Sequence, residues 1–356
     1  MKRIVATISF ALLQLYSLQD SNAQQEKKVQ QWWNAPFMGF PQKKPDAKKL
    51  PLIEVKGNKF VDDKGKTILF RGLSISDPDK LESQGHWNKE HFQKIKEMGA
   101  TLIRIPVHPA AWRERTPEKY IKLLDQAVEW STELGIYIII DWHSIGNLIM
   151  ELFQDLIYNT TRKETFEFWR NIARHFRGNN TVAFYELYNE PTTFSGGLGR
   201  VSWSEWRKLN EDMICIIRGY DKEKIPLVAG FDWAYDLTPL LIEPIQAEGI
   251  GYVTHPYPTK RSQPWEPKWE ENFGFASAKY PVIATEIGFT GGKGPGADSS
   301  NYGERIVKYL EGKGISWCAW VFDPECYPNL FESWDTYKPT QSGEFFKKAM
   351  QAVPVK

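Results

Sequence analysis

The stretch AFYELYNEPTT, residues 183–193, decides the fold because an apolar run ends abruptly in polar residues and a proline. Its first half has the character of a buried strand. Asn189 and Glu190 then bring an amide and a carboxylic acid to the end of that strand. Pro191 stops it, since proline has no backbone N–H to give to a strand ladder. A buried strand that ends in an acid predicts a site where strands open to solvent.

Seven other stretches share the near-continuous apolar character that suits strands buried on both faces of a parallel sheet. Longer amphipathic stretches at 89–100, 117–135, 163–176 and 203–220 lie between them and follow the helical period. Eight strands with intervening helices in about 300 residues predict a closed (β/α)8 TIM barrel. An open doubly wound sheet is the alternative, but no GxGxxG follows the first strand. The strand candidates are ILFRGLSIS (68–76), TLIRIPVH (101–108), IYIIIDWH (136–143), VAFYELYNEP (182–191), PLVAGFDWA (226–234), IGYVTHPY (250–257), PVIATEIGF (281–289) and SWCAWVFD (316–323).

The N-terminal residues are expected to lie outside the barrel. Two basic residues, a mostly apolar run at 4–18 and small residues before Gln24 predict a signal peptide over residues 1–23, too short to be a membrane span. The protein is therefore expected to be secreted or periplasmic. Residues 24–50 read as a linker or docked arm, and their aromatic residues favour the arm. The barrel is expected over 51–356, with a hairpin at 53–68 turning around 63–65.

Composition narrows the class of protein. The net charge of +1 argues against a nucleic-acid or membrane-surface protein, which would need a basic patch. Aromatic residues make up 14% of the chain, including 15 Trp, and suggest core filling or flat platforms for sugar rings. Three cysteines exclude a disulfide framework; Cys318 and Cys326 could pair, but free thiols are favoured. Neither metal-ligand spacing nor a phosphate loop is present, so no metal or cofactor is expected, and GGKGPGADSS (291–300) reads as a flexible loop.

Catalytic types of residue recur at the ends of the predicted strands, where a TIM barrel builds its sites. Each has a structural explanation taken singly, such as a buried ion pair or a packed ring. Six strand ends that all carry such residues favour a site. These residues are Arg104, His143, Asn189, Glu190, His255, Tyr257, Glu286 and Trp320.

Glu190 and Glu286 end strands four and seven, which should face one another across the barrel mouth. Cleavage of an acetal needs one group that protonates the leaving oxygen and another that captures the oxocarbenium-like carbon. A retaining mechanism would need the two carboxyls about 5–5.5 Å apart. Arg104 beside Glu286 should lower the pKa of that carboxyl and keep it ionised.

The motifs RIPV, DWH, YNEP, HPY and TEIGF, in this order, resemble glycoside hydrolase family 5, the retaining cellulase-like barrels, over residues 51–345. The resemblance implies that Glu190 is the acid/base and Glu286 the nucleophile. It also implies that Asn189 binds the sugar 2-hydroxyl, that Arg104 and Tyr257 orient Glu286, and that the hairpin caps the barrel floor. The sugar at the cleaved bond would be lined by His143 and His255 and stacked on Trp320.

We therefore expect a secreted, retaining, endo-acting β-glycosidase, most simply a monomeric endo-β-1,4-glucanase acting on polysaccharide or oligosaccharide. A β-mannanase, mixed-linkage glucanase or xyloglucanase, a transglycosylase and an inactive carbohydrate-binding barrel are the alternatives. The loop after strand three departs from the family in being aliphatic, and residues 148–153 could form a short helix over one end of the cleft. Two or more of five tryptophans are expected to flank the cleft as sugar platforms: Trp112, Trp233, Trp265, Trp269 and Trp334.

Overall fold

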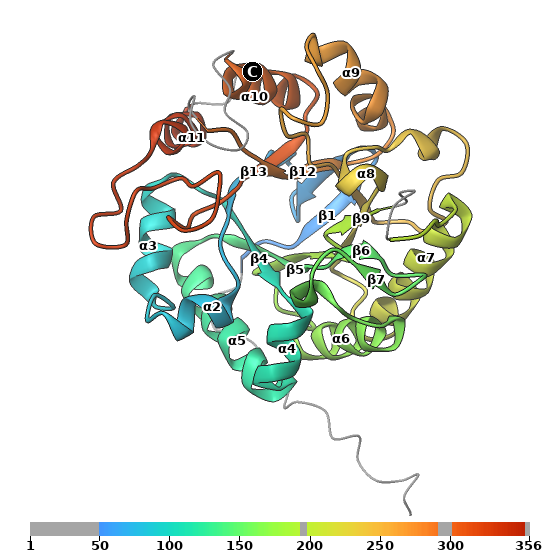
Figure 1. The fold of residues 1–356 in the computed structure, drawn as a ribbon, viewed down its shortest axis with the longest axis horizontal. Helices are drawn as coiled ribbons and strands as arrows, with labels where there is room; N and C mark the ends of the chain where they lie inside the picture. The colour runs from blue at the N-terminus through green and yellow to red at the C-terminus, as the bar shows by residue number, and fades with distance from the viewer. Residues whose placement is uncertain (1–49, 193–197, 291–300, 353–356) are drawn as a thin grey trace, which may run out of the picture. The chain divides into compact units, whose positions relative to one another are not determined.

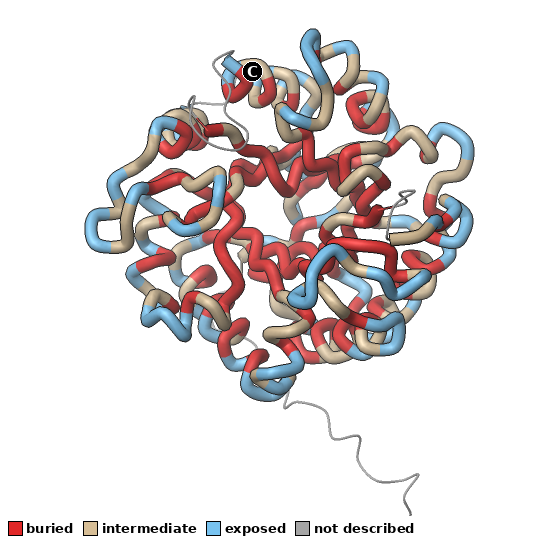
Figure 2. The backbone as a smooth tube through the Cα atoms, in the orientation of Figure 1, coloured by how far each residue is buried: buried red, intermediate tan, exposed pale blue. Residues whose placement is uncertain are grey.

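Eight parallel strands form a closed barrel in the computed structural model, which describes residues 50–192, 198–290 and 301–352. All eight sequence-predicted strands are present, and the TIM barrel is confirmed. The strands lie at the centre with the helices around them (Figure 1), and the residues of the strands are mostly buried (Figure 2). In barrel order they are β3 (Arg71–Ser74), β4 (Leu102–Val107), β5 (Tyr137–Trp142), β8 (Val182–Glu186), β10 (Ile225–Ala229), β11 (Gly251–Val253), β12 (Val282–Ile287) and β13 (Ser316–Ala319).

Helices follow the strands and begin and end at residues that the sequence makes recognisable. Ser202 and Glu205 form a capping box at the start of α7, which satisfies backbone N–H groups that would otherwise lack partners. Gly135 ends α5 with φ 68°, a left-handed conformation that glycine adopts without strain. The helices are α2 (Pro78–Ser83), α3 (Lys89–Glu97), α4 (Pro109–Arg115), α5 (Pro117–Leu134), α6 (Arg162–His175), α7 (Trp203–Tyr220), α8 (Phe231–Ala234), α9 (Trp265–Asn272), α10 (Tyr302–Gly312) and α11 (Gln341–Gln351), with 3-10 turns η2 (Leu156–Tyr158), η3 (Thr238–Leu241) and η4 (Gly274–Ala278).

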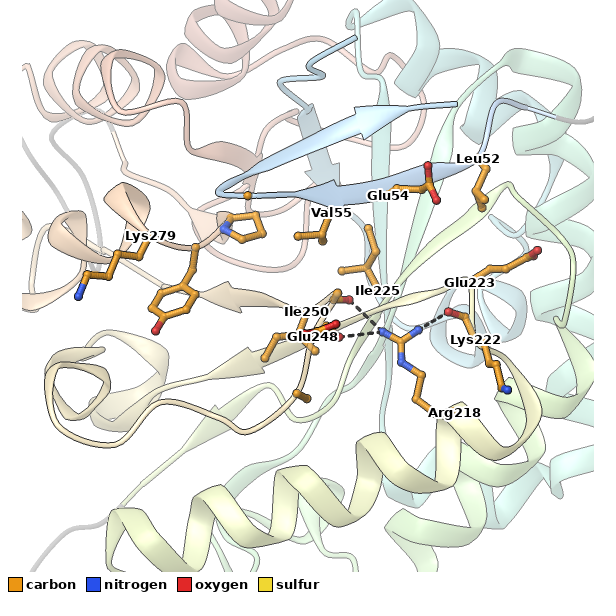
Figure 3. A pocket seen from close by; sticks show the side chains of 15 residues that line it. Leu52, Glu54, Val55, Arg218, Lys222, Glu223, Ile225, Glu248, Ile250 and Lys279 are labelled. Carbon is orange, nitrogen blue, oxygen red and sulfur yellow. Dashed lines mark hydrogen bonds between the residues drawn. The ribbon is translucent and has the colours of Figure 1, made fainter. Parts of the chain in front are cut away.

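A hairpin closes the barrel floor, as predicted. Strands β1 (Ile53–Lys56) and β2 (Lys59–Asp62) pair antiparallel, and Phe60 packs edge-on against Phe184 at 5.0 Å. Figure 3 shows the hairpin above the start of β10, where Arg218 donates to backbone carbonyls of two loops. A groove of about 880 Å³ lies there, between the hairpin and the starts of the strands. The floor is thus sealed by aromatic and aliphatic side chains.

The position of the hairpin turn differs from the prediction. The tight turn between β1 and β2 is Gly57–Asn58, where glycine takes φ 61°, and the turn at 63–65 only leads back to a single bridge between Val61 and Thr67. Both segments carry turn residues, so the local pattern alone could not rank them.

The loop after strand three forms a β-hairpin rather than a helix, so the helix expected over 148–153 is wrong. Strands β6 (Ile145–Asn147) and β7 (Leu152–Phe153) form a hairpin, and β6 pairs in parallel with β9 (Glu190–Pro191). The aliphatic residues fit a helical period, but 148–151 form a turn and Leu152–Phe153 pair antiparallel with β6, which itself pairs with β9. This pairing fixes the chain beside Glu190.

Several predictions concern residues outside the described part of the chain: the signal peptide at 1–23, the arm at 24–50 apart from its last residue, and the glycine-rich run at 291–300. They stay predictions. Within the described ranges, no helix has the length and apolar character needed to cross a membrane. Cys215, Cys318 and Cys326 are free thiols, as favoured.

Candidate active site

The two predicted catalytic carboxyls meet at the mouth of the barrel. Glu190 lies in β9, directly after β8, and Glu286 lies in β12. A carboxylate oxygen of each, together with a ring nitrogen of His255, lies within 4.8 Å of the others. This spacing is close to the about 5–5.5 Å of retaining glycosidases and well short of the about 6.5–9.5 Å of inverting ones.

Arg104 stands beneath Glu286 and is completely buried. Its Nη1 donates to Glu286 Oε1 at 2.8 Å, and its Nη2 donates to Asn189 Oδ1 at 2.7 Å. Tyr257 donates its hydroxyl to the other oxygen, Glu286 Oε2, at 2.7 Å. Both oxygens of Glu286 are therefore held in fixed directions, as expected for residues that orient this carboxylate.

His255 links the two acids. Its Nδ1 lies 3.0 Å from Glu190 Oε1 and 3.8 Å from Glu286 Oε2. Its Nε2 lies 2.9 Å from Thr285 Oγ1, and the whole ring is buried. Because both nitrogens have partners, the imidazole is fixed beside Glu190.

His143 and Trp320 form a second part of the mouth. Their rings lie parallel, 3° apart in plane, with centroids at 5.5 Å. Trp320 is partly exposed, whereas His143 is buried and its Nδ1 lies 2.6 Å from Asp141 Oδ2. The structure thus brings all eight sequence-predicted site residues to one end of the barrel.

Glu186, a buried acid of this network, was not predicted from the sequence, and Asp141 was noted only within the DWH motif at the end of strand three. Glu186 accepts from Arg104 Nε at 2.7 Å and Nη2 at 2.9 Å, and it also accepts from Thr285. Asp141 forms an ion pair with Arg104, with Oδ2 2.9 Å from Nη2. The signal was present in the sequence, since both acids interrupt apolar strands, but only the coordinates show that they share one guanidinium.

Burial and charge set the protonation of this network. Burial raises the pKa of Glu286 and the charge of Glu190 adds to it, while His255 and Arg104 oppose the rise. The expectation that Arg104 would lower the pKa of Glu286 is therefore wrong in its net direction, because burial outweighs the guanidinium. Burial also raises the pKa of Asp141 well above its ordinary value.

The pKa values of His143 and His255 shift in opposite directions. Burial lowers the pKa of His143 well below its ordinary value, and His108, Arg104 and His255 add to this, so His143 is neutral at pH 7. Burial also lowers the pKa of His255, but Glu286, Glu186 and Glu190 outweigh it and raise the value to about 9. His255 is consequently a cation near neutral pH, placed between acids.

The five candidate platform tryptophans divide into two groups. Trp112, Trp265 and Trp269 are at most 4% exposed and pack among aromatic rings, so they hold loops on the barrel and cannot carry a sugar. Trp334 is partly exposed but stacks on His86 at 3.9 Å. Trp233 remains as the candidate beside the acid pair.

The close group of Glu190, His255 and Glu286 has donor atoms of the kinds that bind cations. Arg104, Tyr257 and Thr285 already occupy the oxygens of Glu286 and one nitrogen of His255. We therefore read the group as an acid pair with its hydrogen-bonding partners and assign no metal to it.

A closed (β/α)8 barrel with two facing carboxyls at the C-terminal ends of strands four and seven defines a retaining glycoside hydrolase. The sequence matches the cellulase family (glycosyl hydrolase family 5) over residues 61–325. The chain belongs to that family, and the resemblance drawn from its motifs is confirmed.

Individual relatives agree with this assignment. The chain is similar to the crystal structure of a β-glucanase from Saccharophagus degradans in complex with cellotetraose, with 46% identity and a TM-score of 0.86 over 90% of this chain and 98% of that one. It is 26% identical to endoglucanase A of Butyrivibrio fibrisolvens over 75% of this chain and 59% of the relative, and 24% identical to endoglucanase E-5 of Thermobifida fusca over 77% and 56%. The chain thus spans less than two thirds of the length of these curated relatives.

Proposed function

We propose that the protein hydrolyses internal β-1,4 bonds of glucan chains with retention of configuration. The observation that carries this is the close approach of Glu190 and Glu286, whose oxygens lie within 4.8 Å at the barrel mouth. The binding of cellotetraose by a β-glucanase with 46% identity supports glucan as the substrate. Endo-β-1,4-glucanase is the leading activity, and mixed-linkage glucan, xyloglucan and mannan are the competing substrates.

Glu286 is proposed as the nucleophile and Glu190 as the acid/base. In the first step Glu286 attacks the anomeric carbon while Glu190 gives its proton to the leaving oxygen, which forms a covalent glycosyl-enzyme. In the second step Glu190 takes a proton from water, the water attacks the same carbon, and Glu286 is released. The contacts of Arg104 and Tyr257 with Glu286 favour this assignment, since they aim the carboxylate and stabilise its charge.

The remaining mouth residues are proposed to bind the sugar at the cleaved bond. Arg104 occupies Asn189 Oδ1, so the amide N–H groups of Asn189 are turned toward a substrate 2-hydroxyl. The partly exposed ring of Trp320 supplies a platform, and neutral His143 lies parallel to it. Trp233 is proposed as a second platform on the side of Glu190. We also propose export by the signal peptide, which predicts a mature protein that begins at Gln24 and works outside the cytoplasm.

Kinetics of the Glu286→Gln variant test the proposal. Turnover of β-glucan should fall by about 10³-fold or more because the nucleophile is lost, whereas oligosaccharide binding should stay nearly unchanged. Calorimetric titration with cellotetraose measures the binding. Persistent turnover of polysaccharide by this variant would rule out Glu286 as nucleophile.

A panel of purified substrates tests the specificity. The wild-type protein should release short oligosaccharides from β-1,4-glucan faster than from mannan or xylan. Preferred cleavage of mannan would overturn glucan as the substrate, while the retaining mechanism would stand. Longer products at high acceptor concentration would instead indicate transglycosylation through the same intermediate.

A further inference from the structure

Three loops meet beside the general acid. Strand β6 pairs with β9, which carries Glu190, and α8 packs against β9 from another side (Figure 1). Gln154 follows the β6–β7 hairpin, Trp233 lies in α8, and Lys260 lies in the loop after β11. Because Glu190 protonates the leaving oxygen in the proposed mechanism, we assign these loops to the leaving-group half of the cleft.

Trp233 is held in an uncommon backbone conformation. Asp232, Trp233 and Ala234 have φ of 58°, 52° and 59°, a left-handed region that side chains other than glycine seldom enter. Three such residues in succession persist only where neighbours hold them. The tip of the indole is fixed by Gln154, whose Oε1 accepts from Trp233 Nε1 at 3.0 Å.

Lys260 contacts the segment 232–234 from the loop after β11. Its Nζ donates to Asp232 O at 2.8 Å and lies 4.8 Å from the centre of the Trp233 ring, a cation–π distance. Arg261 next to it pairs with Asp232 Oδ2 at 2.8 Å. An ammonium has three N–H donors, and this carbonyl uses one of them.

The ammonium also lies in the field of the catalytic pair. Burial lowers the pKa of Lys260, while Glu190, Asp232 and Glu286 oppose this and Arg261 reinforces it. Lys260 therefore contacts the candidate platform and is influenced by the charges of both catalytic acids. A positive charge in this place acts on whatever sugar occupies the leaving-group side.

We propose that Lys260 is a specificity-determining residue for the sugar on the leaving-group side, holding the plane of Trp233 and offering N–H donors to that sugar's hydroxyls. This inference rests on the proposed hydrolysis of β-glucan. It predicts that the loss of Lys260 lowers kcat/KM strongly only when the leaving group is a sugar. A residue that merely tied two loops together would affect all substrates alike.

The experiment compares Lys260→Met with the wild type on two substrates. Cellotetraose places a sugar on the leaving-group side, whereas 4-nitrophenyl β-cellobioside places only an aryl group there. The kcat/KM for cellotetraose should fall by about tenfold or more, the loss expected for one hydrogen bond to a charged group, and that for the aryl substrate by no more than about twofold. Because a nearby cation is lost, both limbs of the pH profile on the aryl substrate should move to higher pH.

Matched variants separate this role from general structural damage. Lys268 also ties a loop, donating to Ser262 Oγ at 2.8 Å. Lys268→Met should leave both substrates and the pH profile unchanged, and Lys260→Arg should recover cellotetraose hydrolysis in part. If Lys260→Met fails to fold, Lys260→Gln takes its place.

Equal losses on the two substrates, no loss on either, or an unchanged pH profile would overturn the role of Lys260. Failure of the wild type to hydrolyse both substrates would instead refute the proposed function. The two failures are therefore distinguishable.

Discussion

The two ends of the barrel use the same strands for opposite purposes. On β8, Phe184 faces the apolar floor beside Phe60, and two residues later Glu186 lies in the ion network of the mouth. On β4, Leu102 belongs to the floor and Arg104 to the mouth in the same way. Two residues span only about 7 Å of strand. Within that distance the side chains inside the barrel change from apolar to charged. The floor thus supplies apolar packing, whereas the mouth holds the charged groups of the candidate site.

The largest effect is expected from a change at the mouth that leaves the floor intact. Glu190→Ala should lower kcat/KM on β-glucan by about 10²–10⁴-fold, the usual contribution of general acid catalysis. An aryl cellobioside with an excellent leaving group should lose far less in its first step, because that step needs no proton. Steady-state and burst kinetics on the two substrates measure the difference, and equal losses on both would contradict the acid role.

A change at the floor should act on stability alone. Phe60 is 3% exposed and packs against Phe70 and Phe184, so Phe60→Ala should lower the free energy of unfolding by about 3–5 kcal/mol. Urea denaturation measures this, and kcat of the folded protein should not change. Leu241→Ala, at a position 67% exposed, is the control and should shift stability by no more than about 0.5 kcal/mol. A fall of kcat in folded Phe60→Ala would show that the two ends are coupled.

The smallest expected effect concerns pH. Since the folded protein raises the pKa of Glu286, protonated Glu286 stabilises the fold at low pH, and that contribution is lost as the pH rises above the ordinary value of 4.5. Glu286→Gln mimics the protonated form, so it should gain stability relative to the wild type over the same rise. The acid limb of wild-type kcat/KM should also lie above pH 4.5. Thermal unfolding at several pH values measures the first effect. If the wild type instead became more stable relative to the variant as the pH rises, Arg104 would outweigh burial in setting the pKa of Glu286.

The sequence predicts the apolar strands and the residues that end them, but not the contacts among the charged groups of the mouth. The eight strands were predictable because burial on both faces demands continuous apolar runs, and the mouth residues because they end those runs. Which acids Arg104 contacts depends on the approach of three strands, so its pairing with Asp141 and Glu186 could not be predicted. The three packed tryptophans could not be told from platforms in the sequence, because composition gives the ring but not the direction in which it points.

The loop after strand three shows a different limit. Residues 148–153 satisfy a helical period, yet they form the turn and second strand of a hairpin whose first strand, β6, pairs with β9, some forty residues further along. A pattern over a few neighbouring residues carries no information about a partner strand so far along the chain. The error therefore comes from a non-local hydrogen-bond ladder and not from an unusual local sequence.

The same ladder limits how this protein could be remodelled. Glu190 N donates to Ser144 O at 3.1 Å and Thr192 N to Gly146 O at 3.0 Å. These two hydrogen bonds fix the backbone around the acid to residues 144–146. A Cβ on Gly146 would come within 2.5 Å of Leu152 O, so position 146 has no room for a side chain. Grafts that exchange the hairpin tip between residues 148 and 151 would spare the acid, whereas one that reaches Gly146 would move it.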